Sequence, residues 1–215
     1  MQDKKHRNMF HEDLVIGLMA KFQEVSQNQT IKAIILTGYE NIFSMGGTQE
    51  QLLEISNKER RFTDAPFLYR GLLECPIPVI AAIQGHASGG GLLFGLYSDM
   101  VVMSNEGIYT AVFMKYGFTP GMGATYILEK RFGETLATEM MFTAKSFTGE
   151  ELAKRGAPVI VKKREEVLME AMRIAKLLSE KSKLSLTTLK KELAGRMLEQ
   201  LPKYIEREDI MHDKT

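Results

Sequence analysis

The stretch 83–99, "IQGHASGGGLLFGLYSD", decides the fold of this chain. It continues the apolar run 77–83, "IPVIAAI", and places three consecutive glycines, 89–91, ahead of a second apolar segment. An apolar run of this length is typical of a buried parallel strand, and the segment after the glycines is predicted to be helical. The first N–H groups of a helix have no partner within it, and glycine allows close approach to them. The glycines therefore indicate either an anion-binding junction or close helix–strand packing.

Other segments repeat this alternation of strand and helix. The runs "IKAIILTG" (31–38) and "MVVMS" (100–104) are predicted to be buried strands, and apolar residues at helical spacing predict a helix over 10–27. With the predicted strand at 77–83 and the predicted helix at 91–98, this order is typical of βαβ units. The sequence therefore predicts an α/β fold with a parallel sheet.

The last third of the chain has a different pattern. Thr148 and Glu151 form a capping box ahead of a short helix, and apolar residues at helical spacing predict a long helix over 164–181. A further helix is predicted from Ser185 almost to the end of the chain. We therefore expect this third to be entirely helical.

Composition limits the class of protein. The chain has 215 residues and a formal net charge of +1, which suits one compact domain and gives no electrostatic reason to expect nucleic acid as a partner. The single cysteine, Cys75, excludes an intramolecular disulfide and favours a reducing compartment. No apolar run reaches the roughly 18 to 20 residues that cross a bilayer, and the first residues do not resemble a secretory signal. We expect a cytoplasmic protein without a membrane partner.

A second glycine pair favours an oxyanion site over a phosphate site. Gly46 and Gly47, in "FSMGGTQE", also follow a predicted strand, and Thr48 is a suitable N-cap for the next helix. Two N–H groups from separate strand–helix junctions can converge on one oxygen and stabilise an enolate. Neither a P-loop motif nor a good dinucleotide-binding motif is present.

Three motifs carry a resemblance to a known family. "NIFSMGGT" (41–48), "PVIAAIQGHASGGGLLFGLYSD" (78–99) and "YGFTPGMGAT" (116–125) resemble the crotonase, or enoyl-CoA hydratase/isomerase, superfamily in order and spacing. The resemblance implies an oxyanion hole formed by the N–H groups of Gly47 and Gly90.

The resemblance also implies a fold and an assembly. It implies a spiral core of ββα turns over 1–130 and a C-terminal helical region over 131–215 that builds a homotrimer or a dimer of trimers. Family members begin with a β-hairpin ahead of the segment that matches "MQD", so this hairpin is expected to be absent here.

Two positions depart from the hydratases of this family. Where those enzymes carry two glutamates, this chain has Leu93 and Phe113. Without these carboxylates no group is in place to position and deprotonate a water molecule. An apolar wall would instead desolvate a substrate carboxylate and favour its loss as CO2, although plain core packing is the alternative for both residues.

A closer resemblance concerns a subfamily. "ILTGY" (35–39), "GGTQE" (46–50), "YTAVFMKYGFTPGMGAT" (109–125) and "MHDKT" (211–215) look like the crotonase-type decarboxylases of polyketide β-branching. The resemblance implies a lyase that converts 3-methylglutaconyl-acyl carrier protein to the 3-methylcrotonyl thioester through a dienolate. A Δ3,Δ2-enoyl thioester isomerase and a non-catalytic crotonase-like scaffold are the alternatives.

The subfamily resemblance also implies a proton donor and a cation. His212 matches the position of the catalytic histidine, with a frayed surface histidine as the alternative. In the segment after the first motif, Arg61 is the first candidate for the cation that meets the substrate carboxylate, and Lys58 is the second. An exposed charge run that only solvates this segment is the alternative.

Tyr69 and the other three histidines complete the set of candidates. Tyr69 is expected either to line the acyl pocket or to be simply packed, and His86 to support the glycine motif through a backbone contact or to meet the substrate. His6 and His11 lie in a polar stretch and are expected to be solvated. No metal or cofactor is expected from the sequence.

Overall fold

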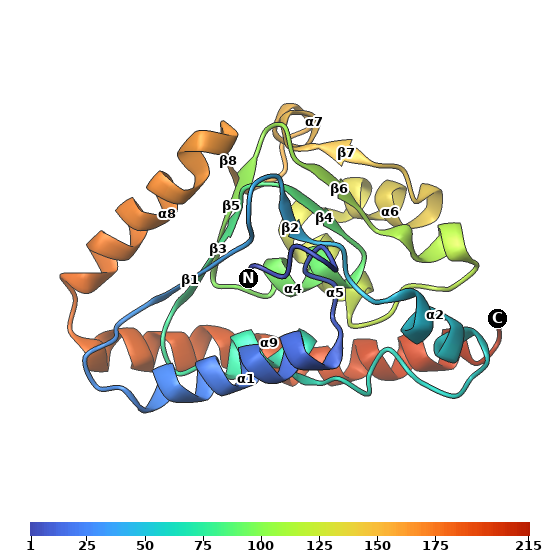
Figure 1. Ribbon diagram of the computed structural model, residues 1–215, viewed down its shortest axis with the longest axis horizontal. Helices are drawn as coiled ribbons and strands as arrows, with labels where there is room; N and C mark the ends of the chain where they lie inside the picture. Colours follow the sequence, from blue (N-terminus) through green and yellow to red (C-terminus); the bar gives the residue numbers. More distant parts are fainter.

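The computed structural model describes residues 1–215, and its strands form two four-stranded sheets (Figure 1). The first sheet has the order β1-β3-β5-β8 and is parallel throughout. The second has the order β2-β4-β6-β7, in which β7 is antiparallel to β6. The strands are β1 Ile34–Thr37, β2 Ile42–Ser44, β3 Val79–Ile83, β4 His86–Ser88, β5 Met100–Ser104, β6 Ile108–Thr110, β7 Phe147–Thr148 and β8 Ile160–Lys162.

The helices join these strands into repeating units. The α-helices are α1 Glu12–Gln27, α2 Gln49–Ser56, α3 Leu72–Glu74, α4 Gly90–Leu96, α5 Ala124–Phe132, α6 Glu134–Thr143, α7 Gly149–Lys154, α8 Arg164–Ser179 and α9 Lys183–His212, and the irregular helical turns are η1 Phe67–Gly71 and η2 Val112–Tyr116. The orders β1-β2-α2 and β3-β4-α4 are ββα turns, and β5-β6 leads through η2 into α5. The predicted ββα fold is therefore confirmed. None of the helices combines the length and the apolar character that crossing a bilayer requires.

Strand β3 is buried on both faces, which explains its uninterrupted apolar sequence. Successive side chains of a strand point to opposite faces. Val79, Ala81 and Ile83 belong to the main core, whereas Ile80 and Ala82 join a smaller core that also contains buried residues of α8. Figure 1 shows α8 alongside this sheet. A parallel sheet covered on both faces needs apolar residues at every position of its central strands.

The last third of the chain is not entirely helical, so that prediction was wrong. Strand β8 pairs with β5 at the edge of the first sheet, and β7 pairs with β6 in the second. Each has at most three residues, and β8 has no fully buried side chain. Runs this short carry no periodic pattern that could distinguish a strand from a loop.

Helix α9 is fixed to the sheets by a buried ion pair. Its 30 residues run along the bottom of the molecule in Figure 1. The Lys190 ammonium lies 2.8 Å from both carboxylate oxygens of Asp99 and donates to the Leu72 carbonyl, while Asp99 also accepts the N–H of Val79. A buried ammonium needs such partners. The contact therefore anchors the amino-terminal part of α9 to α3 and to the residue that precedes β5.

Candidate active site

A cavity of about 750 Å³ lies beside the amino-terminal end of α4. Its walls come from the N-terminal segment, α1, α2, the loop before η1, and η2. Most of the lining is apolar. The charged side chains that line it are the cations Lys5, Arg7, Arg60 and Arg61 and the carboxylate Glu12. The cavity therefore favours an anionic ligand with an apolar portion.

Both predicted oxyanion-hole glycines line this cavity. Gly47 follows β2, and Gly90 is the first residue of α4. No backbone or side-chain partner within the chain accepts the N–H of Gly47, and the Gly90 N–H lies at the start of a helix that has no side-chain cap. The structure thus brings two free backbone donors to one cavity.

Positive φ angles at two glycines bring the two junctions together. Gly46 has a φ of 82° and Gly89 a φ of 50°, a region that side chains rarely adopt. A Cβ added to Gly46 would lie 2.7 Å from the Ser88 carbonyl oxygen and 3.2 Å from the Gly90 nitrogen. The two glycine motifs are therefore in direct contact, as convergence on one oxygen requires.

The segment after Gly47 is held by a local capping box. Thr48 caps α2 by accepting the N–H of Gln51, and the Gln51 side chain accepts the N–H of Thr48 in return, which confirms the predicted N-cap. The Gln51 amide also donates to the Phe10 carbonyl. These bonds fix the loop that carries the Gly47 N–H.

The two positions where hydratases carry glutamates differ in their surroundings. Phe113 lines the cavity, whereas Leu93 is fully buried and is not part of its lining. No carboxylate is present at either position, and Glu12 is the acidic side chain in the cavity wall. The structure therefore gives Phe113 a direct place in the cavity wall, while Leu93 packs in the main core.

Arg61 lines the cavity and contacts the carboxyl end of α9. Its guanidinium lies 3.5 Å from the Asp209 carboxylate and 3.3 Å from the Asp213 carboxylate. Lys58 does not line the cavity, and its ammonium donates to the Asp213 carbonyl. Both candidate cations thus join their loop to α9, but only Arg61 also faces the cavity.

His212 is the last residue of α9 and lies behind the cavity wall. Its ring packs against Phe62 and Phe118 with centroids 5.4 Å and 5.7 Å away, and both of these phenylalanines line the cavity. His212 itself is not in the lining, and its Nδ1 atom is buried without a hydrogen-bond partner. His212 thus contacts the cavity wall through these two rings but does not itself line the cavity.

Tyr69 and His86 lie outside the cavity lining. Tyr69 is buried, donates to the Thr63 carbonyl and borders a second hollow of about 420 Å³ beside α9. His86 accepts the N–H of Ile108 through Nδ1, and burial, with a smaller contribution from Arg164, lowers its pKa. The backbone contact expected for His86 is present.

A buried carboxyl group beside the site was missed by the sequence reasoning. Glu208 of α9 accepts the N–H groups of Gly123 and Thr125 and the Thr125 hydroxyl at the start of α5. Burial raises the pKa of Glu208 to about 7. On the sequence it appears as one more charged residue of a charged helix, so no local pattern distinguishes it from its exposed neighbours.

Comparison with known proteins adds to this geometry. A family model described as enoyl-CoA hydratase/isomerase matches residues 1–215. The bacillaene synthase decarboxylase PksI of Bacillus subtilis (strain 168) is 51% identical over 215 residues, covering 100% of this chain and 86% of that protein. A probable mitochondrial enoyl-CoA hydratase of Dictyostelium discoideum is 25% identical over 186 residues, covering 86% of this chain and 67% of that protein.

Solved structures with the same fold include two that are connected with decarboxylation. One, from a dehydratase/decarboxylase enzyme couple involved in polyketide β-branching, matches with a TM-score of 0.96 and 50% identity, covering 100% of this chain and 87% of that chain. The ECH2 decarboxylase domain of CurF from Lyngbya majuscula matches with a TM-score of 0.95 and 42% identity, with the same coverage.

Proposed function

Because the chain belongs to the enoyl-CoA hydratase/isomerase family and is a crotonase-type decarboxylase of polyketide β-branching, we propose that its substrate is a 3-methylglutaconyl group carried on an acyl carrier protein. The product is the 3-methylcrotonyl thioester. The observation that carries this proposal is the pair of free N–H groups, at Gly47 and Gly90, in a cavity lined by cations.

The oxyanion hole performs the main step. The thioester oxygen accepts the Gly47 and Gly90 N–H groups while the bond between the γ-carbon and the carboxylate breaks. The released electron pair moves through the double bond onto this oxygen, CO2 leaves, and a dienolate remains. Each donor is worth about 2.7–4 kcal/mol to such a developing charge.

The other residues bind the carboxylate and return a proton. Arg61 orients the carboxylate before it leaves, and the apolar side of the wall, which includes Phe113, favours neutral CO2 over the charged group. His212 then donates a proton to the γ-carbon and regains one from solvent. No oxidant, reductant or metal takes part in this sequence of steps.

Two partners follow from this substrate. The carrier protein delivers the acyl group on its phosphopantetheine arm, whose phosphate suits the cations Lys5 and Arg7 in the cavity wall. A dehydratase is the class of enzyme that supplies the conjugated double bond through which the electrons move. We also propose that the chain assembles as a homotrimer or a dimer of trimers.

Release of CO2 is the measurement that tests this function. We expect the protein to release CO2 from 3-methylglutaconyl-acyl carrier protein and to form one 3-methylcrotonyl group for each CO2. The matched control substrate is the 3-methylglutaryl thioester, which lacks the double bond that relays the electrons and should not react. Double-bond migration in a 3-enoyl thioester without CO2 release would instead identify an isomerase. If none of these thioesters is turned over, the result would instead support the alternative of a non-catalytic crotonase-like scaffold.

A further inference from the structure

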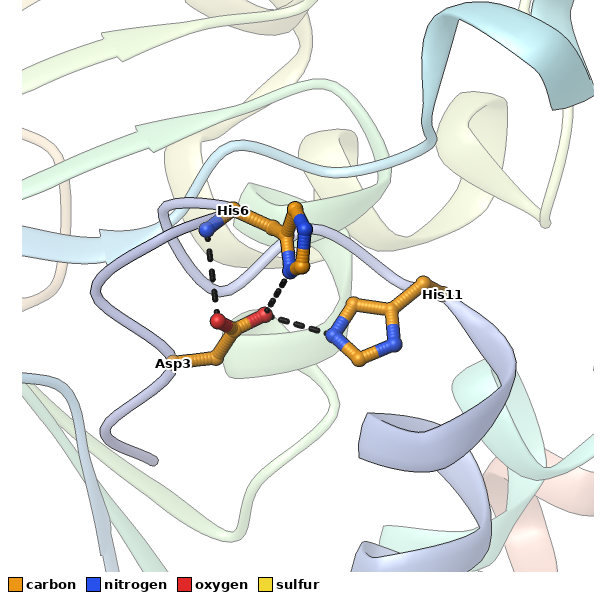
Figure 2. Close-up of side chains that lie close together, drawn as sticks. All are labelled: Asp3, His6 and His11. Carbon is orange, nitrogen blue, oxygen red and sulfur yellow. Dashed lines mark hydrogen bonds and ion pairs between the residues drawn. The ribbon is translucent and has the colours of Figure 1, made fainter.

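Three potential metal ligands lie together in the N-terminal segment. The Asp3 carboxylate lies between two imidazole rings, 3.0 Å from His6 Nδ1 and 2.5 Å from His11 Nε2 (Figure 2). One ligand atom from each of the three side chains lies within 4.8 Å of the others. The two histidines are thus paired with Asp3, while 41% of the His6 side chain and 26% of the His11 side chain stay exposed to solvent, as expected for this polar stretch.

Backbone contacts hold this arrangement in place. Asn8 is fully buried, and its side chain accepts the N–H of Asp3 and donates to the Phe43 carbonyl. Arg7 and Asn8 have φ angles of 52° and 50°, so the chain bends tightly between His6 and His11. Left-handed conformations at two successive residues with side chains are costly and persist only where surrounding contacts enforce them.

His11 stands where a helix usually has a capping residue. It is the N-cap of α1, a position that favours Ser, Thr, Asp or Asn, yet its side chain makes no cap hydrogen bond. The ring is instead directed at Asp3 (Figure 2). The chain therefore forgoes a local stabilising contact and places an imidazole beside a carboxylate.

We propose that Asp3, His6 and His11 bind a divalent transition-metal ion of the zinc class. Two imidazole nitrogens and one carboxylate oxygen are a common ligand set for such ions. Ligand atoms of a tetrahedral zinc ion are separated by about 3.3 Å, given metal–ligand distances near 2.0–2.1 Å. The separations seen here differ from this value by an amount that side-chain rotation can absorb.

The charges around the cluster are compatible with a cation. The positive end of the α1 dipole opposes it, but Glu12 and Asp13 occupy the first turn of the same helix. Lys4, the nearest cation in sequence to Asp3, is paired with Glu40.

Metal binding at this cluster would act on the oxyanion loop through the backbone. The Phe10 N–H donates to the Gly46 carbonyl, and the Met45 N–H donates to the Arg7 carbonyl. The segment 3–11 therefore pairs directly with the first glycine motif. An ion that fixes this segment stabilises the folded protein by mass action, and it restrains the loop that carries the Gly47 N–H.

Binding of zinc and cobalt to the untagged protein tests the proposal. We expect wild type to bind one equivalent of Zn²⁺ by calorimetry, to gain thermal stability, and to give the visible absorption of a four-coordinate Co²⁺ centre. His11→Ser and Asp3→Asn should lose all three responses. Serine is a good N-cap, so His11→Ser removes a ligand without weakening α1. His86→Gln, which changes a histidine outside the cluster, should bind both metals as wild type does.

The outcomes separate this proposal from the proposed decarboxylase. Absence of one-equivalent binding to wild type overturns it, and so does equal binding by His11→Ser, which would assign the metal to other residues. CO2 release measured after chelation is an independent result. The CO2 measurement tests the proposed decarboxylase, whereas the three binding measurements test the metal site, so failure of one proposal can be told apart from failure of the other.

Discussion

Gly47 and Gly90 contribute only backbone to the site. Their N–H groups are free because one follows a strand and the other begins a helix, so neither has an acceptor in regular structure. A side chain at Gly90 would lie 3.0 Å from the Met122 sulfur, whereas one at Gly47 would make only ordinary contacts, the nearest at 3.5 Å with Gln51. Gly47 is therefore the better position for testing the donor.

We expect Gly47→Pro to lower kcat for decarboxylation by roughly 10²–10³-fold, because proline has no N–H to donate to the oxyanion. Gly47→Ala keeps the donor and is the matched control, with activity close to wild type. Single-turnover CO2 release, together with circular dichroism to confirm folding, measures the difference. Equal activity of the proline and alanine variants would exclude this donor.

His212 is a second test at the residue scale. We expect His212→Ala to lower kcat by roughly 10²–10⁴-fold, the range for losing a general acid. Because the change opens space beside Phe62 and Phe118, added imidazole should restore part of the rate. An unchanged rate, or a loss that imidazole does not relieve, would remove His212 from the proton transfer.

At the scale of elements, local signals predicted boundaries well. The Thr48 cap of α2, the Thr148–Glu151 box of α7 and the buried strand β3 are all confirmed. Each cap joins residues three apart, so the sequence contains the whole interaction, and the unbroken apolar run of β3 records that both of its faces are buried. Strands β7 and β8 were missed because their stability comes from pairing with β6 and β5, which lie far away in the chain.

The contact between α9 and α5 predicts a pH dependence of stability. The pKa of Glu208 is about 7 in the folded protein, against an ordinary value of 4.5. Between these values the folded protein keeps a proton that the unfolded chain releases. The protonated Glu208 carboxyl therefore stabilises the folded protein fully at a pH below its ordinary pKa of 4.5. This stabilisation is lost as the pH rises through the folded pKa of about 7.

We expect the free energy of unfolding of wild type to fall across this window relative to that of Glu208→Gln, which does not titrate. The relative loss is up to about 3 kcal/mol, from a pKa rise of roughly 2.5 units. Urea unfolding at about pH 5 and about pH 8 measures it. The exposed Glu206→Gln is the control and should follow wild type. A difference between wild type and Glu208→Gln that does not change with pH would contradict this pKa.

For the whole molecule, the cavity gathers cations from distant parts of the chain. Lys5 and Arg7 come from the N-terminal segment, and Arg60 and Arg61 from the loop after α2. Their combined potential should attract an anionic acyl group and its carrier protein, and salt should screen this attraction.

We therefore expect KM for the carrier-bound substrate to rise with ionic strength while kcat changes little. Lys5→Gln should weaken binding by up to about 1 kcal/mol, roughly a five-fold rise in KM, and should reduce the salt dependence. Lys203→Gln, an exposed cation on α9 away from the cavity lining, is the matched control. Equal KM and equal salt dependence for both variants would argue against steering by these cations.

The sequence by itself determined the repeated strand–helix order and the two glycine motifs, because helix caps join near neighbours and because long apolar runs and glycines are visible directly in the order of residue types. The sequence also showed that two apolar residues, Leu93 and Phe113, stand where the hydratases of this family carry glutamates. Only the tertiary structure decided which candidates share a cavity: Arg61 and Phe113 do, whereas Lys58, Tyr69, His86, Leu93 and His212 lie outside its lining. Likewise, the carboxyl group of Glu208 and the N-terminal cluster gain their properties from burial and from partners that folding brings together. Those contacts join residues distant in the chain, or depend on a loop bent by its surroundings, and no local pattern of residue types records them.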